Sequence, residues 1–514
     1  MSLDTLLLWR ARSPAGGSPA PLELPIELSR VQEAFNLTAL QLRGVDRHLP
    51  PSDWEEFTEI NRTYPSLPIL FFESTKNKHS VMFYKNNTCA PLPSAFMVDF
   101  DNTYWQTLRS SDGVFYIYKA YYDSRRKATI GASVRILAVV NRASPKVTTY
   151  CQFWFESGNE PLIVKYYDYK HIWKPEMGPY VDGVLQPYLV TCKIPPEYSD
   201  KVPVAVSLVE SECSHARNFL RVINDVPEKK GTFAVCVRGR HLLEDTSPRL
   251  IEWMELLFVL GAEKIFFYNF FIHPNISKVI DYYAALGKAE ATPISLPGGR
   301  PNFPLLQQYY LLHHPLQQYV NEIILYNDCL YRNLNSYKYV IPLDVDEVVV
   351  PVNNGNWTSL LESITSNSDG EETDNVYASY NVPQSHFLDK LRDGLALNYS
   401  DIPDFMHILQ HVYRTSELTA SNDDDYSKAF YDTEQVISMN DRFPIHVHEY
   451  IQETYFVSNG SAKVHSYSQD CVEGLNEECD IIRADPVEDR SEYGYCRPGT
   501  LYWVTNTTFV SHPK

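Results

Sequence analysis

Short apolar runs alternate with helix-like segments from Gly231 onward. Residues 232–237 form the first run, and the next segment has a helix start at Ser247 and Pro248 and a stop at Gly261. Further predicted elements are a strand at 264–269, a helix at 276–286, a shorter strand at 291–295, two helices on either side of Pro315, and a strand that ends at Asp344. Strands joined by helices predict an α/β fold with a mainly parallel sheet, which binds ligands at the carboxyl ends of its strands.

Residues 31–225 have a different, β-rich pattern. Turn residues separate apolar runs at the intervals typical of a sandwich, and these runs lie at 68–72, 113–118, 133–140, 148–155 and 202–207. Four aromatic residues in this region suit a sugar-binding platform or, more commonly, a packed core; they are Trp105, Tyr121, Tyr122 and Trp154. The expected parts are a flexible stem at 1–30, a β-rich sandwich-like domain at 31–225 and a catalytic domain at 226–514.

Two carboxylates, Asp344 and Asp346, end the last predicted strand of the alternating region. One apolar run precedes them, and another follows and stops at Pro351. Two residues of a strand that are separated by one other residue point to the same face. A hard divalent cation that also binds nucleotide phosphates would offset the cost of burying both carboxylates. The alternative is a strand-end turn in which they merely cap backbone groups.

The context of this Asp-x-Asp motif separates it from two other matches. The match at 99–101 lies beside Asn102 and Thr103, which indicates a strand end or a turn, and the match at 423–425 lies in a polar run that indicates a solvated loop. Arg238 follows one of the predicted parallel strands and Asn269 ends the next, so both should lie at the same edge of the sheet as Asp344. This coincidence favours a ligand site over a simple turn.

Several sequence features indicate the secretory pathway. Nine cysteines occur without metal-ligand spacing such as Cys-x-x-Cys, which favours disulfides over a zinc site. A net charge of −19 argues against nucleic acid or an anionic membrane as partner. Eight N-glycosylation acceptors are spread along the chain, at Asn36, Asn61, Asn86, Asn275, Asn356, Asn398, Asn459 and Asn506. Residues 6–9 are too short an apolar run for an anchor, so we expect the anchor to lie outside this chain.

Three segments resemble glycosyltransferase family 92 in sequence, order and spacing: EWMELLFVLGAEKIFFY (252–268), NDCLYR (327–332) and LDVDEV (343–348). The resemblance implies a GT-A (Rossmann-like) catalytic domain and an inverting galactosyltransferase that uses UDP-galactose and manganese. It implies β1,4 transfer to terminal galactose or to fucose of N-glycans on a glycoprotein acceptor. The expected location is the Golgi lumen, as a type II membrane protein, or outside the cell as a secreted protein, and a homodimer is compatible with both.

The resemblance, together with the chemistry, assigns roles to residues. We expect the metal ligands to be Asp344, Asp346 and a C-terminal histidine, with His448 and His465 preferred over His446. We expect the donor nucleotide to be bound by Arg238, Arg240, Asn269, Asp344 and Lys428. An inverting transfer needs a general base, and the candidates are Glu417, Asp424 and Glu449.

Each assignment has a structural alternative. Arg238 and Arg240 could belong to a solvated basic loop, and any of the histidines could be buried structural residues. Glu347 is expected on the opposite face of the strand from the two aspartates, with a structural role. His386 could line the acceptor site, although packing is the commoner role. For the whole chain, the main alternative is a noncatalytic, lectin-like glycoprotein, which would need neither Asp346 nor a metal.

Overall fold

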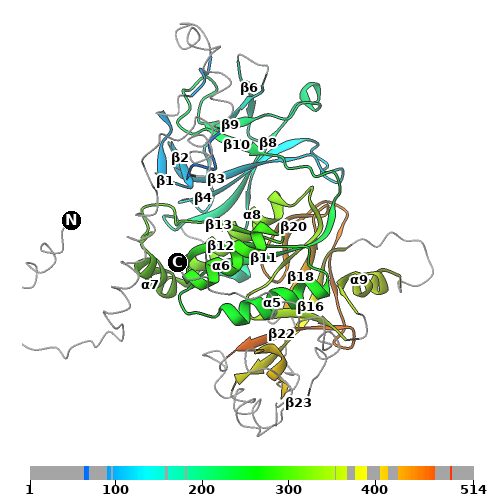
Figure 1. The fold of residues 1–514 in the computed structure, drawn as a ribbon. Coiled ribbons are helices and arrows are strands. Elements are labelled where there is room, and N and C mark those ends of the chain that lie inside the picture. Colours follow the sequence, from blue (N-terminus) through cyan, green and yellow to red (C-terminus); the bar gives the residue numbers. More distant parts are fainter. Residues whose placement is uncertain are drawn as a thin grey trace, which may run out of the picture. The chain divides into compact units, whose positions relative to one another are not determined.

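The computed structural model describes residues 63–68, 89–93, 97–156, 160–179, 182–352, 355–366, 377–389, 406–411, 413–414, 427–468 and 487–488. All of them belong to the compact unit Ile60–Lys514, and none belongs to the other unit, Met1–Glu59. Two mixed sheets dominate the described region (Figure 1). The class is therefore mixed α/β with a β-rich N-terminal region, as the sequence predicts.

The first sheet has ten strands in the order β6-β5-β9-β10-β3-β4-β8-β7, with β2 beside β3 and β1 beside β2. The strands are β1 Phe100–Asn102, β2 Trp105–Ser110, β3 Gly113–Asp123, β4 Ser133–Val140, β5 Tyr150–Trp154, β6 Leu162–Lys165, β7 Asp168–His171, β8 Gln186–Lys193, β9 Ala205–Val209 and β10 Leu220–Ile223. Two short 3-10 helices, η4 Pro175–Met177 and η5 Pro196–Tyr198, lie between them. Four predicted runs fall on β3, β4, β5 and β9; the run at 68–72 lies almost entirely outside the described residues.

This first sheet curls around a core of its own. Side chains of β3, β4 and β8 pack against side chains of β5 and β9, which belong to the other half of the strand order. A disulfide between Cys151 on β5 and Cys192 on β8 joins the same two halves. The four aromatic residues considered as a sugar platform are all buried, which fits packing.

The second sheet has nine strands in the order β13-β12-β11-β14-β18-β16-β22-β15, with β21 beside β16. The strands are β11 Gly231–Leu242, β12 Lys264–Ile272, β13 Ala289–Pro293, β14 Tyr337–Pro342, β15 Glu347–Pro351, β16 Tyr377–Leu388, β18 Ser427–Asp432, β21 Gln452–Phe456 and β22 Ala462–Ser468. The strands β13, β12, β11 and β14 are parallel to one another. Two small sheets pair β17 Tyr413–Arg414 with β23 Val487–Glu488, and β19 Val436–Met439 with β20 Pro444–Val447.

Helices cover both faces of the parallel strands. These are α5 Ser247–Leu260, α6 Pro274–Ala285, α8 Pro315–Arg332 and α9 Trp357–Ser366, and the region also contains α7 Pro304–His313. The alternating residues of β11 show the division: Phe233 and Val235 pack with α5 and α6, whereas Ala234 and Cys236 pack with α8. A strand buried on both faces must be apolar throughout, which explains the continuous apolar run in the sequence.

The predicted helices are confirmed, and the predicted strand ends are not. Proline lies in the first turn of α5, and Gly261 ends this helix with a φ of 124°, although the N-cap is Thr246 and not Ser247. The strands β11 and β12 both run past their predicted ends, because they stay paired as far as Leu242 and Ile272. Arg238 and Arg240 therefore belong to a strand with an irregular register, and the prediction of a loop there was wrong.

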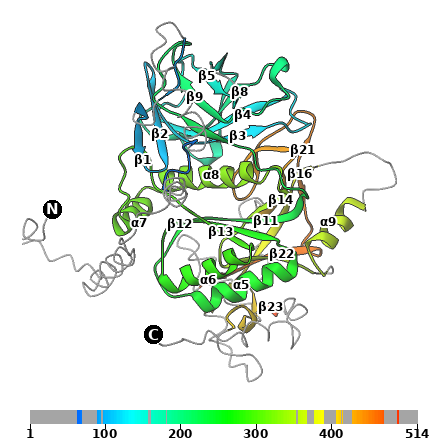
Figure 2. The same ribbon diagram turned by 45° about the horizontal axis from the view of Figure 1, so that its top comes forward.

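Helix α8 lies between the two sheets (Figure 2). A disulfide joins Cys329 on α8 to Cys236 on β11. The buried carboxylate of Asp328 on α8 lies 3.0 Å from Lys119 Nζ of β3 and accepts a 2.5 Å hydrogen bond from Tyr268 of β12. Asp328 therefore ties α8 to both sheets at once.

Lys119 gives this junction a pH dependence. Burial lowers the pKa of Lys119 from 10.5 to about 8, although Asp328 opposes the shift. Between these two values the unfolded chain binds more protons than the folded chain, so the contribution of Lys119 to stability rises with pH. We expect the stability advantage of the native protein over Lys119→Met to grow by about 2 kcal/mol between pH 7 and pH 9.5, as measured by urea denaturation.

The control for this prediction is Lys193→Met, because Lys193 is exposed on β8. Its stability difference from the native protein should stay constant over the same pH range. A constant difference for Lys119→Met as well would mean that Lys119 remains charged up to pH 9.5 and would contradict the prediction.

Three disulfides lie within the described residues: Cys89–Cys213, Cys151–Cys192 and Cys236–Cys329. Disulfides persist in oxidising compartments, so they indicate an extracytoplasmic location. No helix in the described ranges combines the length and the apolar character needed to cross a membrane.

Candidate functional site

The residues Asp344 and Asp346 lie in a tight turn between β14 and β15. The turn is closed by two hydrogen bonds: Glu347 N donates to Asp344 O (3.0 Å), and Asp344 N donates to Glu347 Oε2 (2.9 Å). Because β14 ends at Pro342, the prediction that both carboxylates share one strand face was wrong. The apolar runs before and after the motif belong to two strands in different places of the sheet, β14 beside β11 and β15 beside β22.

Arg238 holds the first carboxylate of the motif. Its Nε lies 2.7 Å from Asp344 Oδ1, and its other end lies 3.1 Å from Glu322 Oε1 on α8. Burial alone would lower the pKa of Arg238, but Asp344 and Glu322 raise it well above its usual value. The predicted nearness of Arg238 and Asp344 is confirmed, and the guanidinium is paired inside the site instead of lying in a solvated loop.

Lys428 on β18 holds the other side of the turn. Its Nζ lies 3.1 Å from Glu347 Oε2 and 3.2 Å from Asp441 Oδ2, and all three side chains are buried. Burial would lower the pKa of Lys428, but these two carboxylates raise it. Burial raises the pKa of Glu347, Lys428 opposes this shift, and the charges of Asp344 and Asp346 add to it. Glu347 therefore belongs with the two aspartates, and its expected separation from them was wrong.

These groups form one ionic cluster. We define it as the carboxylates of Glu322, Asp344, Asp346, Glu347 and Asp441 and the cations of Arg238, Lys428 and Arg442. Five carboxylates face three cations, so this set has a formal charge of −2 when every group is ionised. Carboxylate oxygens are the preferred ligands of hard divalent cations. The donor set therefore fits the divalent metal that the family resemblance implies.

Asn269 and Arg240 lie on neighbouring strands near this cluster. Asn269 is half-buried on β12, and its backbone pairs with that of Arg240 on β11, two residues beyond Arg238. The side chain of Arg240 is outside the described part of the structure. The roles of Asn269 and Arg240 in nucleotide binding stay predictions.

The two preferred histidines lie in different surroundings. His465 is buried on β22, where its backbone pairs with Val348 of β15, and the amide of Tyr467 two residues later donates to Asp346 O (2.8 Å). His448 is buried just after β20, and burial followed by the charge of Arg125 lowers its pKa to about 4. His465 therefore lies in the strand beside the motif, whereas His448 is near a charged residue of the N-terminal region.

The remaining candidates are placed only in part. His446 lies 2.8 Å (Nδ1) from Ser438 Oγ, and burial lowers its pKa to about 4. Burial also lowers the pKa of His386 on β16. Glu449 is exposed in the segment between β20 and β21. Glu417 and Asp424 lie outside the described residues, and the identity of the base stays a prediction.

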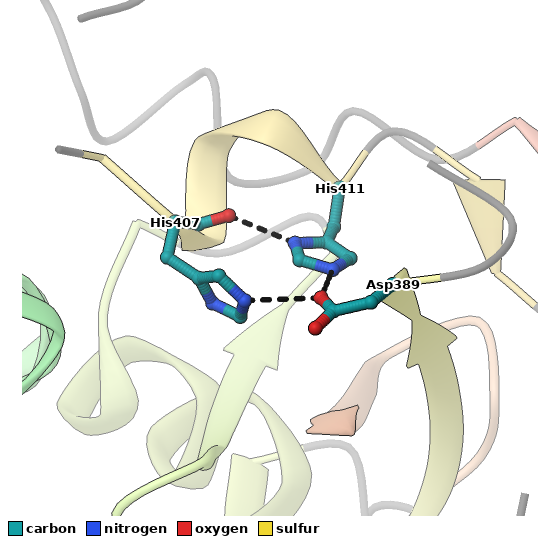
Figure 3. Close-up of side chains that lie close together, drawn as sticks. All are labelled: Asp389, His407 and His411. Carbon is teal, nitrogen blue, oxygen red and sulfur yellow. Dashed lines mark hydrogen bonds and ion pairs between the residues drawn. The ribbon is translucent and has the colours of Figure 1, made fainter. Parts of the chain in front are cut away.

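The sequence reasoning missed a group of three potential metal ligands. Asp389, His407 and His411 bring their ligand atoms within 4.8 Å of one another (Figure 3). The available signal was the spacing of His407 and His411, four residues apart, which is common among paired metal ligands. It also missed Glu322, whose partner Arg238 is 84 residues away, and Asp441, which pairs with Lys428 on a strand that the sequence reasoning had not assigned.

One of three comparisons with known proteins identifies a family. The family model described as Glycosyltransferase family 92 matches residues 231–492, which is half of the chain. No curated protein matches. Two crystal structures of S. aureus TarS 1-349, one of them in complex with UDP, match with a TM-score of 0.24 and identities of 9% and 10%. The match covers 46% of this chain and only 60% of TarS, and a likeness this slight supports no argument. On the family match, the chain belongs to glycosyltransferase family 92.

Proposed function

We propose that this chain is an inverting, metal-dependent β-1,4-galactosyltransferase that moves galactose from UDP-galactose to a glycan. Its acceptor would be terminal galactose or fucose of N-glycans on glycoproteins. The ionic cluster is the observation that supports this proposal best. It places a carboxylate turn, in a cluster with two surplus negative charges, just beyond the carboxyl end of β14, where the pairing of β14 with the parallel strand β11 stops at Pro342 and Cys236. Parallel α/β sheets bind their ligands at this edge, and we assign the GT-A fold to this region on the same grounds.

The divalent ion, manganese in this proposal, would be held by Asp346 and Asp344, and its charge would stabilise the leaving diphosphate. Arg238 fixes the carboxylate of Asp344 from the side of β11. Lys428 fixes Glu347, whose carboxylate in turn binds the amide of Asp344. Since Lys428 already contacts two carboxylates, we assign it to positioning the turn.

Other residues complete the donor site in this proposal. Asn269 and Arg240 would contact the nucleotide from the neighbouring strands. His465, on the strand beside the motif, is proposed as the further metal ligand ahead of His448. A general base would deprotonate the acceptor hydroxyl as it attacks the anomeric carbon, and the candidates are Glu417, Asp424 and Glu449.

The proposed location is the Golgi lumen, or the extracellular space for a secreted form. The three disulfides support an oxidising compartment. The acceptor would be a glycoprotein that passes through the same compartment.

The decisive experiment is release of UDP by the purified protein. We expect release from UDP-galactose, and not from UDP-glucose, in the presence of a galactose-terminated or fucose-containing N-glycan and manganese. A chelator should abolish release, and the product should contain β1,4-linked galactose. Glycan binding that ignores metal, with no UDP release on any acceptor, would instead support the lectin-like alternative.

A further inference from the structure

Asp389, His407 and His411 form a compact group apart from the ionic cluster. Asp389 directly follows β16, and the two histidines flank the short 3-10 helix η6, Ile408–Gln410. Asp389 Oδ1 lies 3.1 Å from His407 Nε2 and 2.8 Å from His411 Nε2 (Figure 3). One carboxylate oxygen therefore faces both ring nitrogens, and a single ion placed among them could reach all three side chains.

The hydrogen bonding of His411 defines which of its nitrogens can bind an ion. Its Nδ1 lies 2.8 Å from the carbonyl oxygen of His407, and a carbonyl only accepts, so Nδ1 carries the proton. In the neutral ring, Nε2 then presents a lone pair to the carboxylate of Asp389. The ring nitrogen and the carboxylate oxygen face each other at 2.8 Å, an arrangement that a shared proton or a metal ion can bridge. A backbone carbonyl that fixes the tautomer in this way is typical of metal-binding histidines.

The segment that carries the histidines is held independently of Asp389. The buried carboxylate of Glu252 on α5 accepts backbone hydrogen bonds from His407 (2.7 Å), Ile408 (3.0 Å) and Leu409 (3.3 Å). The side chain of His411 is fully buried, and those of His407 and Asp389 are 11% and 16% exposed. The group is thus built into the protein, with a limited opening through which a water could complete a coordination shell.

We propose that Asp389, His407 and His411 bind one zinc ion, separate from the divalent ion proposed at Asp346. Two imidazoles and a carboxylate suit zinc, which binds such sites more tightly than manganese does. The donors at Asp346 are mainly carboxylates, a harder set that also suits manganese or magnesium. The two sites therefore differ in ligand chemistry, and this inference does not depend on which sugar the protein transfers.

The contacts of Tyr467 suggest what this ion does. The ring of Tyr467 lies 5.4 Å from the ring of His411 and 6.5 Å from that of His407, measured between centroids. Its backbone amide donates to the carbonyl of Asp346. An ion that joins the end of β16 to η6 would fix the two histidine rings that lie beside the ring of Tyr467. Tyr467 in turn is hydrogen-bonded to the Asp-x-Asp turn.

The test measures metal binding without turnover. The full chain is stripped with dipicolinate and titrated with zinc in competition with a chromophoric chelator. We expect one zinc per chain, a higher melting temperature with zinc, and the visible absorption of tetrahedral cobalt when Co²⁺ replaces it. His407→Gln should weaken zinc binding by at least the ~10- to 100-fold that loss of an outer-shell partner alone would cause.

The matched controls are His313→Gln and Asp346→Asn. His313 lies at the end of α7 with its ring exposed, so its loss should leave zinc affinity unchanged. Asp346→Asn should also keep the zinc while losing transfer, which separates this inference from the proposed function. If His407→Gln fails to fold, the isosteric Asp389→Asn replaces it with the same expectation. Equal zinc affinity in the native protein and in the folded ligand variant would overturn the proposal and assign the group to a proton shared between His411 and Asp389.

Discussion

Asp346→Asn should lower kcat/KM for UDP release by about 10³-fold or more, a loss of about 4 kcal/mol in transition-state stabilisation. The substitution removes one of the two surplus negative charges of the ionic cluster, so the site holds its divalent ion more weakly. The fold should persist, because the bond from Tyr467 N to Asp346 uses the backbone carbonyl, which asparagine keeps. The measurement is UDP release against manganese concentration, and higher manganese should recover only part of the activity.

The chain supplies its own control for this substitution. Asp99 belongs to another Asp-x-Asp sequence, but it lies beside the first sheet, where it pairs with Arg217 at 3.2 Å. Asp99→Asn makes the same chemical change in a matching sequence pattern and should leave activity unchanged. Equal activity of the native protein and Asp346→Asn would show that the turn is structural and would remove the main support for the proposed function.

Local signals in the sequence predicted the parallel strands β11 to β14, the helices α5 to α8 and four strands of the first sheet, but not the strands from β16 onward. The helix α5 is readable because Pro248 and Gly261 mark its ends, and β4 is readable because a continuous apolar run lies between polar turns. The ends of β11 and β12 were missed because the two strands stay hydrogen-bonded to each other beyond their apolar runs. No local sequence pattern reveals this continued pairing. Strand length here depends on the neighbouring strand as well as on the composition of the strand itself.

The candidate site shows the same division between local and distant information. Arg238 and Asp344 could be placed together because they follow neighbouring apolar runs of a parallel sheet, and each lies two residues past the last pair of β11 and β14, Cys236 and Pro342. Glu347 was misplaced, because the alternation of side chains applies only within a strand and the motif lies in a turn. Glu322 pairs with Arg238 from a helix 84 residues away, and only the packing of α8 on β11 brings the two together.

Lys428→Met should lower the free energy of unfolding by about 3–5 kcal/mol, the usual cost of breaking a buried ion pair from one side. Methionine keeps the unbranched shape of the lysine side chain without its terminal ammonium group, so the loss reflects charge more than volume. Without the ammonium group, the buried carboxylates of Glu347 and Asp441 have lost the cation that lies 3.1 and 3.2 Å from them. Urea denaturation at pH 7 measures the change, and transfer activity should fall with it because Glu347 closes the Asp-x-Asp turn.

The pH dependence of this loss identifies its cause. In the native protein, burial raises the pKa of Asp441, but the charges of Lys428, Arg442 and Arg238 lower it by more. The pKa of Asp441 therefore lies below its usual value. Such a carboxyl stabilises the fold above its unfolded pKa and loses that contribution as the pH falls. In Lys428→Met the pKa of Asp441 in the folded state rises, so protonation of this carboxyl at lower pH removes an unpaired buried charge. The difference in unfolding free energy between the native protein and the variant should therefore become smaller between pH 7 and pH 5.

Two further variants separate charge from packing at this position. Lys428→Arg keeps the charge and should retain most of the stability. Lys338→Met changes an exposed lysine on β14, the strand beside β18, and should stay within about 0.5 kcal/mol of the native protein. If Lys428→Met showed a deficit as small as that of Lys338→Met, the carboxylates around the turn would need no internal cation, and the ionic cluster would not hold the turn in place.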